Sequence, residues 1–416
     1  MQKFATSNGL VKFATILFIL YGIYYIPIDG RINIGPVKLT LVVMSLFTLL
    51  TSCLYMSRAM VLGTIYLIFQ FISASFHPET FRWSTLLYST ILVYTYVCFY
   101  NMVTVKRVFT IEYFIKLCKW MMMAYFVVCV VQQAFLLVGV KYLPLINLCQ
   151  IFNRGIGCNS LCQEPSTFGR FMLVFYYAYI KCSEYKRGEG PFSPIELFSG
   201  EHKWITIRFL WMMLTMGSGT AFICLILLTG YFVRKHNWYY VIPALILGYS
   251  LLQASGVEAL DRATEAIEAT STLDSKVISQ TDTSAATRIT PFINSLNADF
   301  SKLETWVGYG IDSGFKVNRF ERTMFDDYGF IFYIIALLLN FTCAYSFWSL
   351  APIFMFAGVA GGAGGNIQYA WELMMILTCV KYFHDNRFNP EIYDDEEEEE
   401  EDVCETLCNE TTEQTL

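Results

Sequence analysis

The segment CNSLCQEPSTFGR, residues 158–170, places residue types that could do chemistry at the edge of an apolar stretch. Glu164 stands just before Pro165, and Ser166 follows it, which is an ordinary order at a helix start. Arg170 lies about one turn further in, where a charge is costly unless it is paired or faces a wet cavity. The segment could serve as a redox clip, a metal site, an ion gate or one wall of a site for an anionic lipid-linked substrate.

Two cysteines in this segment, Cys158 and Cys162, bear on the first two of those uses. No histidine lies near them to complete a tetrahedral set, so a zinc site is disfavoured and no metal is expected. Free thiols or a local disulfide are both compatible with their spacing. Most of the 13 cysteines lie inside apolar runs, where they behave as small apolar residues.

Arginines in two other polar segments could act on the same substrate. Arg154 lies in the turn NRGIG, and Arg288 lies in TSAATRI, just before a predicted helix that runs from residue 290 through Phe300 and Leu303. The planar guanidinium group makes paired, charge-assisted hydrogen bonds to a pyrophosphate. The alternative is that both arginines only interact with lipid phosphates or nearby acids, and spacing alone does not decide between these uses.

The composition shows which elements must position these residues. The chain is 55% hydrophobic and 15% charged, against about 25% charged residues in soluble domains. Runs of about 20 apolar residues point to membrane spans, and backbone satisfaction in lipid requires helices. We therefore predict an all-α, polytopic transmembrane protein of about 12 spans, near residues 9–27, 39–56, 59–76, 84–102, 118–139, 166–183, 204–216, 217–233, 237–254, 327–349, 351–365 and 367–384.

Lysine and arginine near the runs predict the orientation. They are far more frequent in the connections on the side of the N-terminus, which places that terminus in the cytoplasm. Residues 1–390 then form one transmembrane domain with two large outer loops, 141–165 and 255–325. Residues 391–416, an acidic run without apolar periodicity, are predicted to be a disordered tail that is also cytoplasmic.

Several motifs in matching order resemble the O-antigen polymerase (Wzy-type) family. They are R-x-x-G from Arg154, EPS-x-F-G from Glu164, GSGTAF at 217–222, SAATRI at 284–289 and WVGYGI at 306–311. The resemblance covers about residues 140–380, and earlier spans match only as apolar helices. It implies an enzyme of the bacterial inner membrane that joins undecaprenyl-pyrophosphate-linked oligosaccharide repeats on the periplasmic face, a polysaccharide polymerase and therefore a glycosyltransferase.

The resemblance also implies roles for residues. Arg154 and Arg288 match the family's arginines on the two outer loops and would bind the donor pyrophosphate, with Arg170 and Ser166 also at the substrate. Glu164 would act as the catalytic base. The arginine that members often carry beside Ser218 is absent here, so that turn has no charge role. No cofactor and no nucleic acid are expected, whereas membrane lipids, a chain-length regulator and a flippase are expected partners.

Two alternatives stay open from the sequence. The related O-antigen ligases use the same donor with lipid A core as acceptor, but they carry a histidine on the long outer loop, and residues 255–325 contain none. A transporter or flippase of lipid-linked sugars would need broken or polar helices at mid-membrane depth in two related halves. Only GVAGGAGGN, residues 358–366, hints at a broken helix.

Overall fold

A computed structural model describes most of the helical part of the chain. The described residues are 8–23, 36–51, 55–140, 157–162, 164–232, 298–310, 324–344 and 368–389, with isolated residues between 239 and 280. Within them every regular element is helical and no strand occurs. Arg154, Arg288, the run 351–365, most of 237–254 and the acidic tail from residue 391 onward lie outside the described residues.

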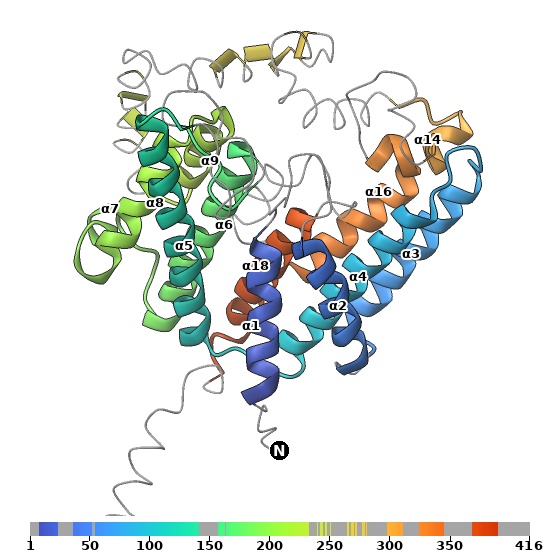
Figure 1. Cartoon of the computed structure of the whole chain (residues 1–416), viewed down its shortest axis with the longest axis horizontal. Coiled ribbons are helices and arrows are strands. Elements are labelled where there is room, and N and C mark those ends of the chain that lie inside the picture. Colours follow the sequence, from blue (N-terminus) through green and yellow to red (C-terminus); the bar gives the residue numbers. More distant parts are fainter. Residues whose placement is uncertain are drawn as a thin grey trace, which may run out of the picture.

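Ten of the described helices fall on predicted apolar runs, whereas α7, η1 and α14 do not. In chain order they are α1 (Asn8–Gly22), α2 (Pro36–Thr51), α3 (Arg58–Ser75), α4 (Trp83–Thr104), α5 (Ile111–Leu137), α6 (Pro165–Arg187), α7 (Pro194–Leu197), η1 (Gly200–His202), α8 (Lys203–Thr215), α9 (Gly219–Thr229), α14 (Leu303–Val307), α16 (Met324–Cys343) and α18 (Gln368–Asn386). Most of them run up and down between two ends of a bundle (Figure 1). We call the end where α1 starts the proximal end, and the end where α1 finishes the distal end.

Two boundaries differ from the prediction. α5 begins at Ile111 rather than near residue 118, because Thr110 caps it by accepting from the Tyr113 N–H at 3.2 Å. Its first turns carry charged residues, so the apolar pattern begins later than the helix. The predicted helix through Phe300 is wrong there, since residues 298–302 are not helical and the short α14 starts at Leu303.

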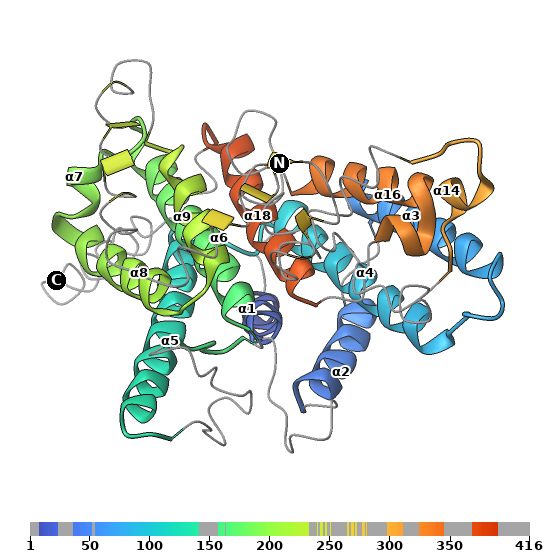
Figure 2. The same ribbon diagram turned by 90° about the horizontal axis from the view of Figure 1, so that it is seen from above.

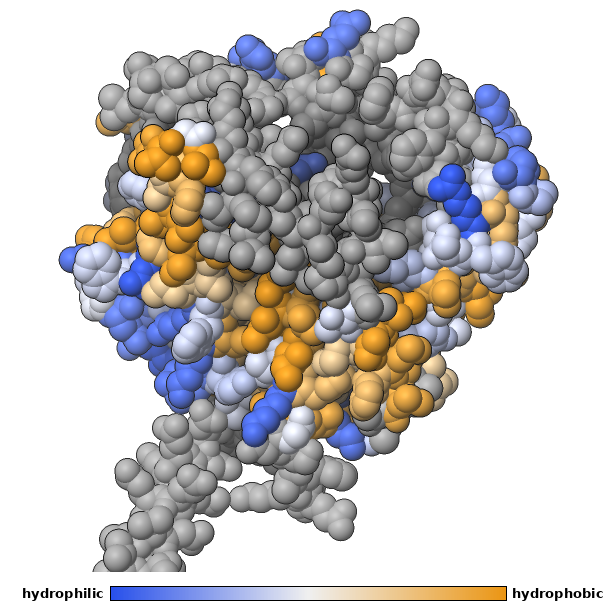
Figure 3. All heavy atoms as spheres, viewed as in Figure 1, coloured by the Kyte–Doolittle hydropathy of each residue, from blue (hydrophilic) through white to orange (hydrophobic). Residues whose placement is uncertain are grey.

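Three described helices are long and apolar enough to cross a membrane: α3, α4 and α5. Shorter apolar helices lie in α1, α2, α9 and α16. On the face in Figure 3, hydrophobic side chains form a band across the middle, and hydrophilic ones gather below it, toward the proximal end. Helices α2 and α5 also expose large apolar side chains: Leu46, Phe47, Leu50 and Trp120. The architecture is that of a helical membrane protein.

The two most polar long helices, α6 and α18, occupy the centre. They pack against each other, and α1, α4, α5, α8 and α9 surround them (Figures 1 and 2). Nearly every side chain of α6 from Ser166 to Ile180 is buried, and α18 is buried from Ala370 to Val380. A helix enclosed on all sides by protein does not need an apolar lipid-facing stripe. Arg170 of α6 and Glu372 of α18, which lie within these buried stretches, therefore face protein neighbours rather than lipid.

Candidate functional site

The stretch Gly157–Cys162 is held inside the distal half of the bundle. Gly157, Cys158, Asn159, Ser160 and Cys162 are all buried. Gln132 of α5 fixes the stretch by binding both backbone groups of Ser160, donating to its carbonyl at 3.1 Å and accepting from its N–H at 2.8 Å. Ser160 also donates to the Tyr125 carbonyl at 2.7 Å. These bonds satisfy buried backbone groups that no regular element pairs, so the path into α6 is fixed by α5.

The cysteines of this stretch do not pair with each other. Cys158 has its Sγ 3.2 Å from the Sγ of Cys129 on α5, whereas the Sγ of Cys162 lies 3.6 Å from the Tyr125 hydroxyl. All three are buried, and none of them forms a disulfide. The local Cys158–Cys162 disulfide that the spacing allowed is therefore not formed, because the turn between the two residues directs each side chain toward α5.

Glu164 is the N-cap residue of α6, but its side chain does not cap the helix. The carboxylate is exposed and accepts a hydrogen bond from the Ser166 hydroxyl at 3.0 Å. Pro165 occupies the first helical position, as the sequence predicted. A Glu that served only the helix start would bind the free N–H groups of the first turn, and this one does not. Its oxygens remain accessible to a substrate hydroxyl.

Arg170 lies on the second turn of α6 and is only 3% exposed. Gly169, the residue before Arg170, is the point at which two of the sequence motifs pack against each other. A Cβ on Gly169 would lie 3.3 Å from the Cα of Ala221 and from the Sδ of Met216, so the first turn of α9 packs directly on α6. The EPS-x-F-G and GSGTAF motifs thus meet at the distal end, which their separation in sequence did not show.

The WVGYG motif forms a second cluster at the distal end, over α3 and α16. The Gly308 carbonyl lies 2.8 Å from Nε2 of His77, and the Gly310 N–H donates to the Asp327 carbonyl at 3.1 Å. Gly308 and Gly329 both have a positive φ, +86° and +85°. Each lies directly against the backbone of the segment that contains the other. The motif is a backbone joint that fixes α14 to α16.

Substituting Gly308 by alanine should break this joint. The new Cβ would lie 2.3 Å from the Asp327 carbonyl oxygen and would force a side chain into a positive-φ conformation. We expect a loss of about 3 kcal/mol of stability, measured by thermal unfolding in detergent. Gly190→Ala is the matched control, because a Cβ there meets nothing within 4 Å. Equal stability of the two variants would contradict this assignment.

The two clusters do not converge within the described residues. α6 and α9 lie on one side of the bundle and α14 and α16 on the other, with α18 between them (Figures 1 and 2). The start of α18 carries Glu372, which is fully buried. Neither carboxylate oxygen of Glu372 has a hydrogen-bond partner in the described part of the chain. Sequence reasoning passed over this residue, although an acid inside a predicted span is a signal by itself.

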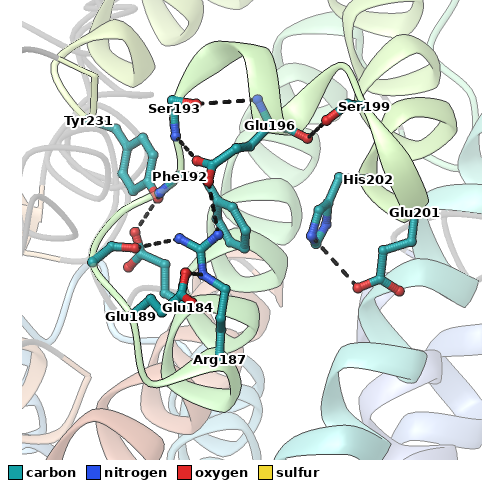
Figure 4. A network of polar contacts seen from close by, with 11 residues as sticks. Glu184, Arg187, Glu189, Phe192, Ser193, Glu196, Ser199, Glu201, His202 and Tyr231 are labelled. Carbon is teal, nitrogen blue, oxygen red and sulfur yellow. Dashed lines mark hydrogen bonds and ion pairs between the residues drawn. The ribbon is translucent and has the colours of Figure 1, made fainter.

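A polar network at the proximal end offers a second candidate (Figure 4). Arg187 pairs with Glu189 at 2.9 Å and with Glu196 at 3.2 Å, and its guanidinium lies 4.1 Å from the centre of the Phe192 ring. Glu196 forms a capping box with Ser193. All of these contacts join the end of α6 to residues of the connector between α6 and α8, or join connector residues to one another. We therefore assign this network a structural role.

His202 makes this connector sensitive to pH. Burial lowers the pKa of His202, against the opposing effect of Glu201, and Tyr179 is hydrogen-bonded to its Nδ1 at 2.6 Å. The unfolded chain therefore binds the proton more readily than the folded one, and stability should fall as pH drops below about 6.5. His202→Gln should lose that part of the pH dependence. Melting temperatures of both proteins across this range give the test, and parallel curves would contradict it.

Neither the described residues nor comparisons with known proteins assign this site further. Among the residues that the structure describes, no group of three His, Cys, Asp or Glu side chains could hold a metal ion. Searches of protein-family models, curated proteins and solved structures each gave no match to this chain. The site at the start of α6 therefore has to be interpreted from its own geometry and from the motifs.

Proposed function

We propose that this protein is a polysaccharide polymerase of the bacterial inner membrane. It would join undecaprenyl-pyrophosphate-linked oligosaccharide repeats, of O-antigen, capsule or exopolysaccharide, at the periplasmic face. The observation that carries the proposal is the start of α6, where an exposed Glu164 and a buried Arg170 stand on either side of the first helical turn, next to the GSGTAF segment. The ordered motifs at 154–169, 217–222, 284–289 and 306–311 support the same reading.

The distribution of charge supports placing the site outside the cell. Lys186 at the end of α6 pairs with Glu112 at the start of α5, and Lys119 pairs with Glu201 at 3.7 Å. The ring of His384 on α18 lies 5.6 Å from that of Tyr185. These contacts gather the basic helix ends at the proximal end, which the positive-inside rule assigns to the cytoplasm. The distal end, with Glu164, would then face the periplasm, and both termini would be cytoplasmic.

The proposed reaction is a glycosyl transfer between two lipid-linked molecules. An acceptor sugar hydroxyl attacks the anomeric carbon of the donor, and the bond from that carbon to the pyrophosphate oxygen breaks. The hydroxyl proton passes to Glu164, and the leaving lipid pyrophosphate keeps the bonding electron pair. Arg154 and Arg288 would stabilise its growing charge, with Arg170 and Ser166 at the substrate. The step as written uses no cofactor and no metal.

Glu164→Gln tests the proposed base. The amide keeps the shape of the side chain and its contact with Ser166, but it cannot readily take a proton. We expect polymer formation by the purified protein to fall about a hundredfold, while binding of the lipid donor survives. Glu304→Gln is the control, because Glu304 is also an exposed acid at the distal end. Normal turnover in Glu164→Gln would exclude Glu164 as the base.

A deletion strain separates the polymerase from its alternatives. If the proposal holds, cells without this protein keep single repeats on their acceptor and lose long chains. Loss of all attached chains would instead assign an O-antigen ligase, and accumulation of lipid-linked repeats on the cytoplasmic side would assign a flippase. The length ladder of the extracted polysaccharide, compared with that of a complemented strain, distinguishes the three outcomes.

A further inference from the structure

Glu372 is a buried acid that the proposed reaction does not use. It sits about 6 Å along α18 from the start of the helix and is 0% exposed. In the described chain its two oxygens have no hydrogen-bond partner, and no lysine, arginine or histidine pairs with it. Natural proteins leave few buried polar atoms unsatisfied, so such a residue calls for an explanation.

The surroundings of Glu372 are apolar or uncharged. Its Oε1 is 3.5 Å from the position of a Cβ on Gly22, at the end of α1, and the side chains of Met121 and Phe175 border the same glycine. The titratable groups that face it from the packed helices are Tyr21 of α1, Cys118 and Tyr125 of α5, and Cys379 of α18, with Tyr96 of α4 and Cys182 of α6 beyond them. None of these supplies a positive charge.

The same chain shows how it accommodates a charged buried glutamate. Glu184, near the proximal end of α6, is also buried, but it forms an ion pair with Lys181 and accepts from the Tyr231 hydroxyl. An ionised carboxylate without such partners in a low-dielectric interior costs several kcal/mol. A bound proton removes that cost. The contrast with Glu184 therefore indicates a neutral carboxylic acid at position 372.

One hydroxyl connects Glu372 to the stretch that leads into the candidate site. Tyr125 donates to the Gly22 carbonyl, beside which Glu372 lies, and its oxygen is 3.6 Å from the Sγ of Cys162. An ionised Glu372 would be a stronger acceptor than the neutral Gly22 carbonyl and would compete for the Tyr125 proton. Movement of the Tyr125 side chain toward Glu372 would break its hydrogen bond to α1 and would take its oxygen, which accepts from the Cys162 thiol, away from Cys162.

We propose that Glu372 is a proton-binding site coupled through Tyr125 to the docking of residues 157–162. With the proton bound, the stretch stays buried against α5 and fixes the start of α6. With the proton released, the Tyr125 side chain moves toward the carboxylate, Cys162 loses its hydrogen-bond acceptor, and the stretch loosens. The proton site stands on the buried geometry alone; its effect on turnover rests on the proposed function, because Glu164 follows this stretch.

A hydrophobic carbodiimide tests the proton site, since it modifies protonated carboxyl groups in apolar surroundings. In membranes near neutral pH, dicyclohexylcarbodiimide should modify Glu372, as found by mass spectrometry of the peptide. The ion-paired Glu184 is the matched control and should stay unmodified. Absence of the modification at Glu372, with the exposed Glu164 modified in the same sample by a water-soluble carbodiimide, would overturn the proposal.

Thiol labelling tests the coupling. Cys162 should react with a maleimide at least about tenfold faster at about pH 10 than at about pH 6, relative to the isosteric Glu372→Gln variant. Glu372→Gln, permanently neutral, should keep Cys162 protected throughout, and Tyr125→Phe should expose it at both values. Identical pH dependence in Glu372→Gln and the parent protein would overturn the coupling. None of these readouts requires polymer formation, so they are independent of the proposed function.

Discussion

Alanine at Arg154 or at Arg288 is expected to abolish polymer formation while the protein level stays normal. The donor leaves as a lipid pyrophosphate, and its growing negative charge is the chief demand of the proposed transition state. A guanidinium group meets this demand with two parallel charge-assisted hydrogen bonds, and removing one such donor from a preorganised site costs about a hundredfold to a thousandfold in rate. Lysine should restore little, because it keeps the charge and loses the paired fork.

The control for this experiment is the loss of a cation that the structure describes at the distal end. Lys302 is 62% exposed, and its pairing with Asp299 at 3.7 Å is a surface contact of little energy. Lys302→Ala should therefore leave polymer formation unchanged. Binding of the lipid donor and polymer formation are measured on the same purified proteins. Full activity in both arginine variants would exclude the proposed mechanism.

Most of the long helices were predictable from the sequence because a long apolar run must satisfy its own backbone hydrogen bonds, both in lipid and inside the bundle. α3 and α4 start and finish within two or three residues of the predicted runs. α5 shows the limit of the method, since its polar first turns are helical for a local reason, the Thr110 cap, which an apolar scan ignores. The segment 298–302 shows the converse: it lies within a helix predicted from apolar spacing, but it is not helical.

The parts of the site that sequence could not give depend on contacts between distant segments. Spacing allowed either free thiols or a Cys158–Cys162 disulfide, but Cys129, far away in the chain, is the neighbour of Cys158. The meeting of Gly169 with Ala221 likewise depends on how α6 and α9 pack. Glu372 was visible as an acid in an apolar run, yet its lack of partners is a property of the packed interior. Glu164, Ser166 and Arg170 stand at the helix start that the sequence predicted.

Gln132→Ala should have the second large effect, on the folding of the site. The substitution removes both hydrogen bonds that Gln132 makes to the backbone N–H and carbonyl of the buried Ser160. Each unsatisfied buried group costs about 1–3 kcal/mol, so we expect a loss of about 2–5 kcal/mol in local or global stability. Because the stretch that Gln132 holds leads directly into Glu164, polymer formation should fall at least about tenfold in protein that remains folded.

The neighbouring Gln133 provides a control of the same chemistry. It also makes two hydrogen bonds, donating to the Thr215 hydroxyl at 2.7 Å and accepting from Trp211 Nε1 at 3.0 Å, but both partners are on α8 rather than in residues 157–162. Trp211 is 48% exposed, so a lost bond there leaves a group that other partners can reach. Gln133→Ala should cost about 1 kcal/mol and leave Cys158 and Cys162 protected from maleimide, whereas Gln132→Ala should expose them. If the two variants behave alike in thiol labelling and in turnover, Gln132 does not hold the site, and the path into α6 must be fixed by other contacts.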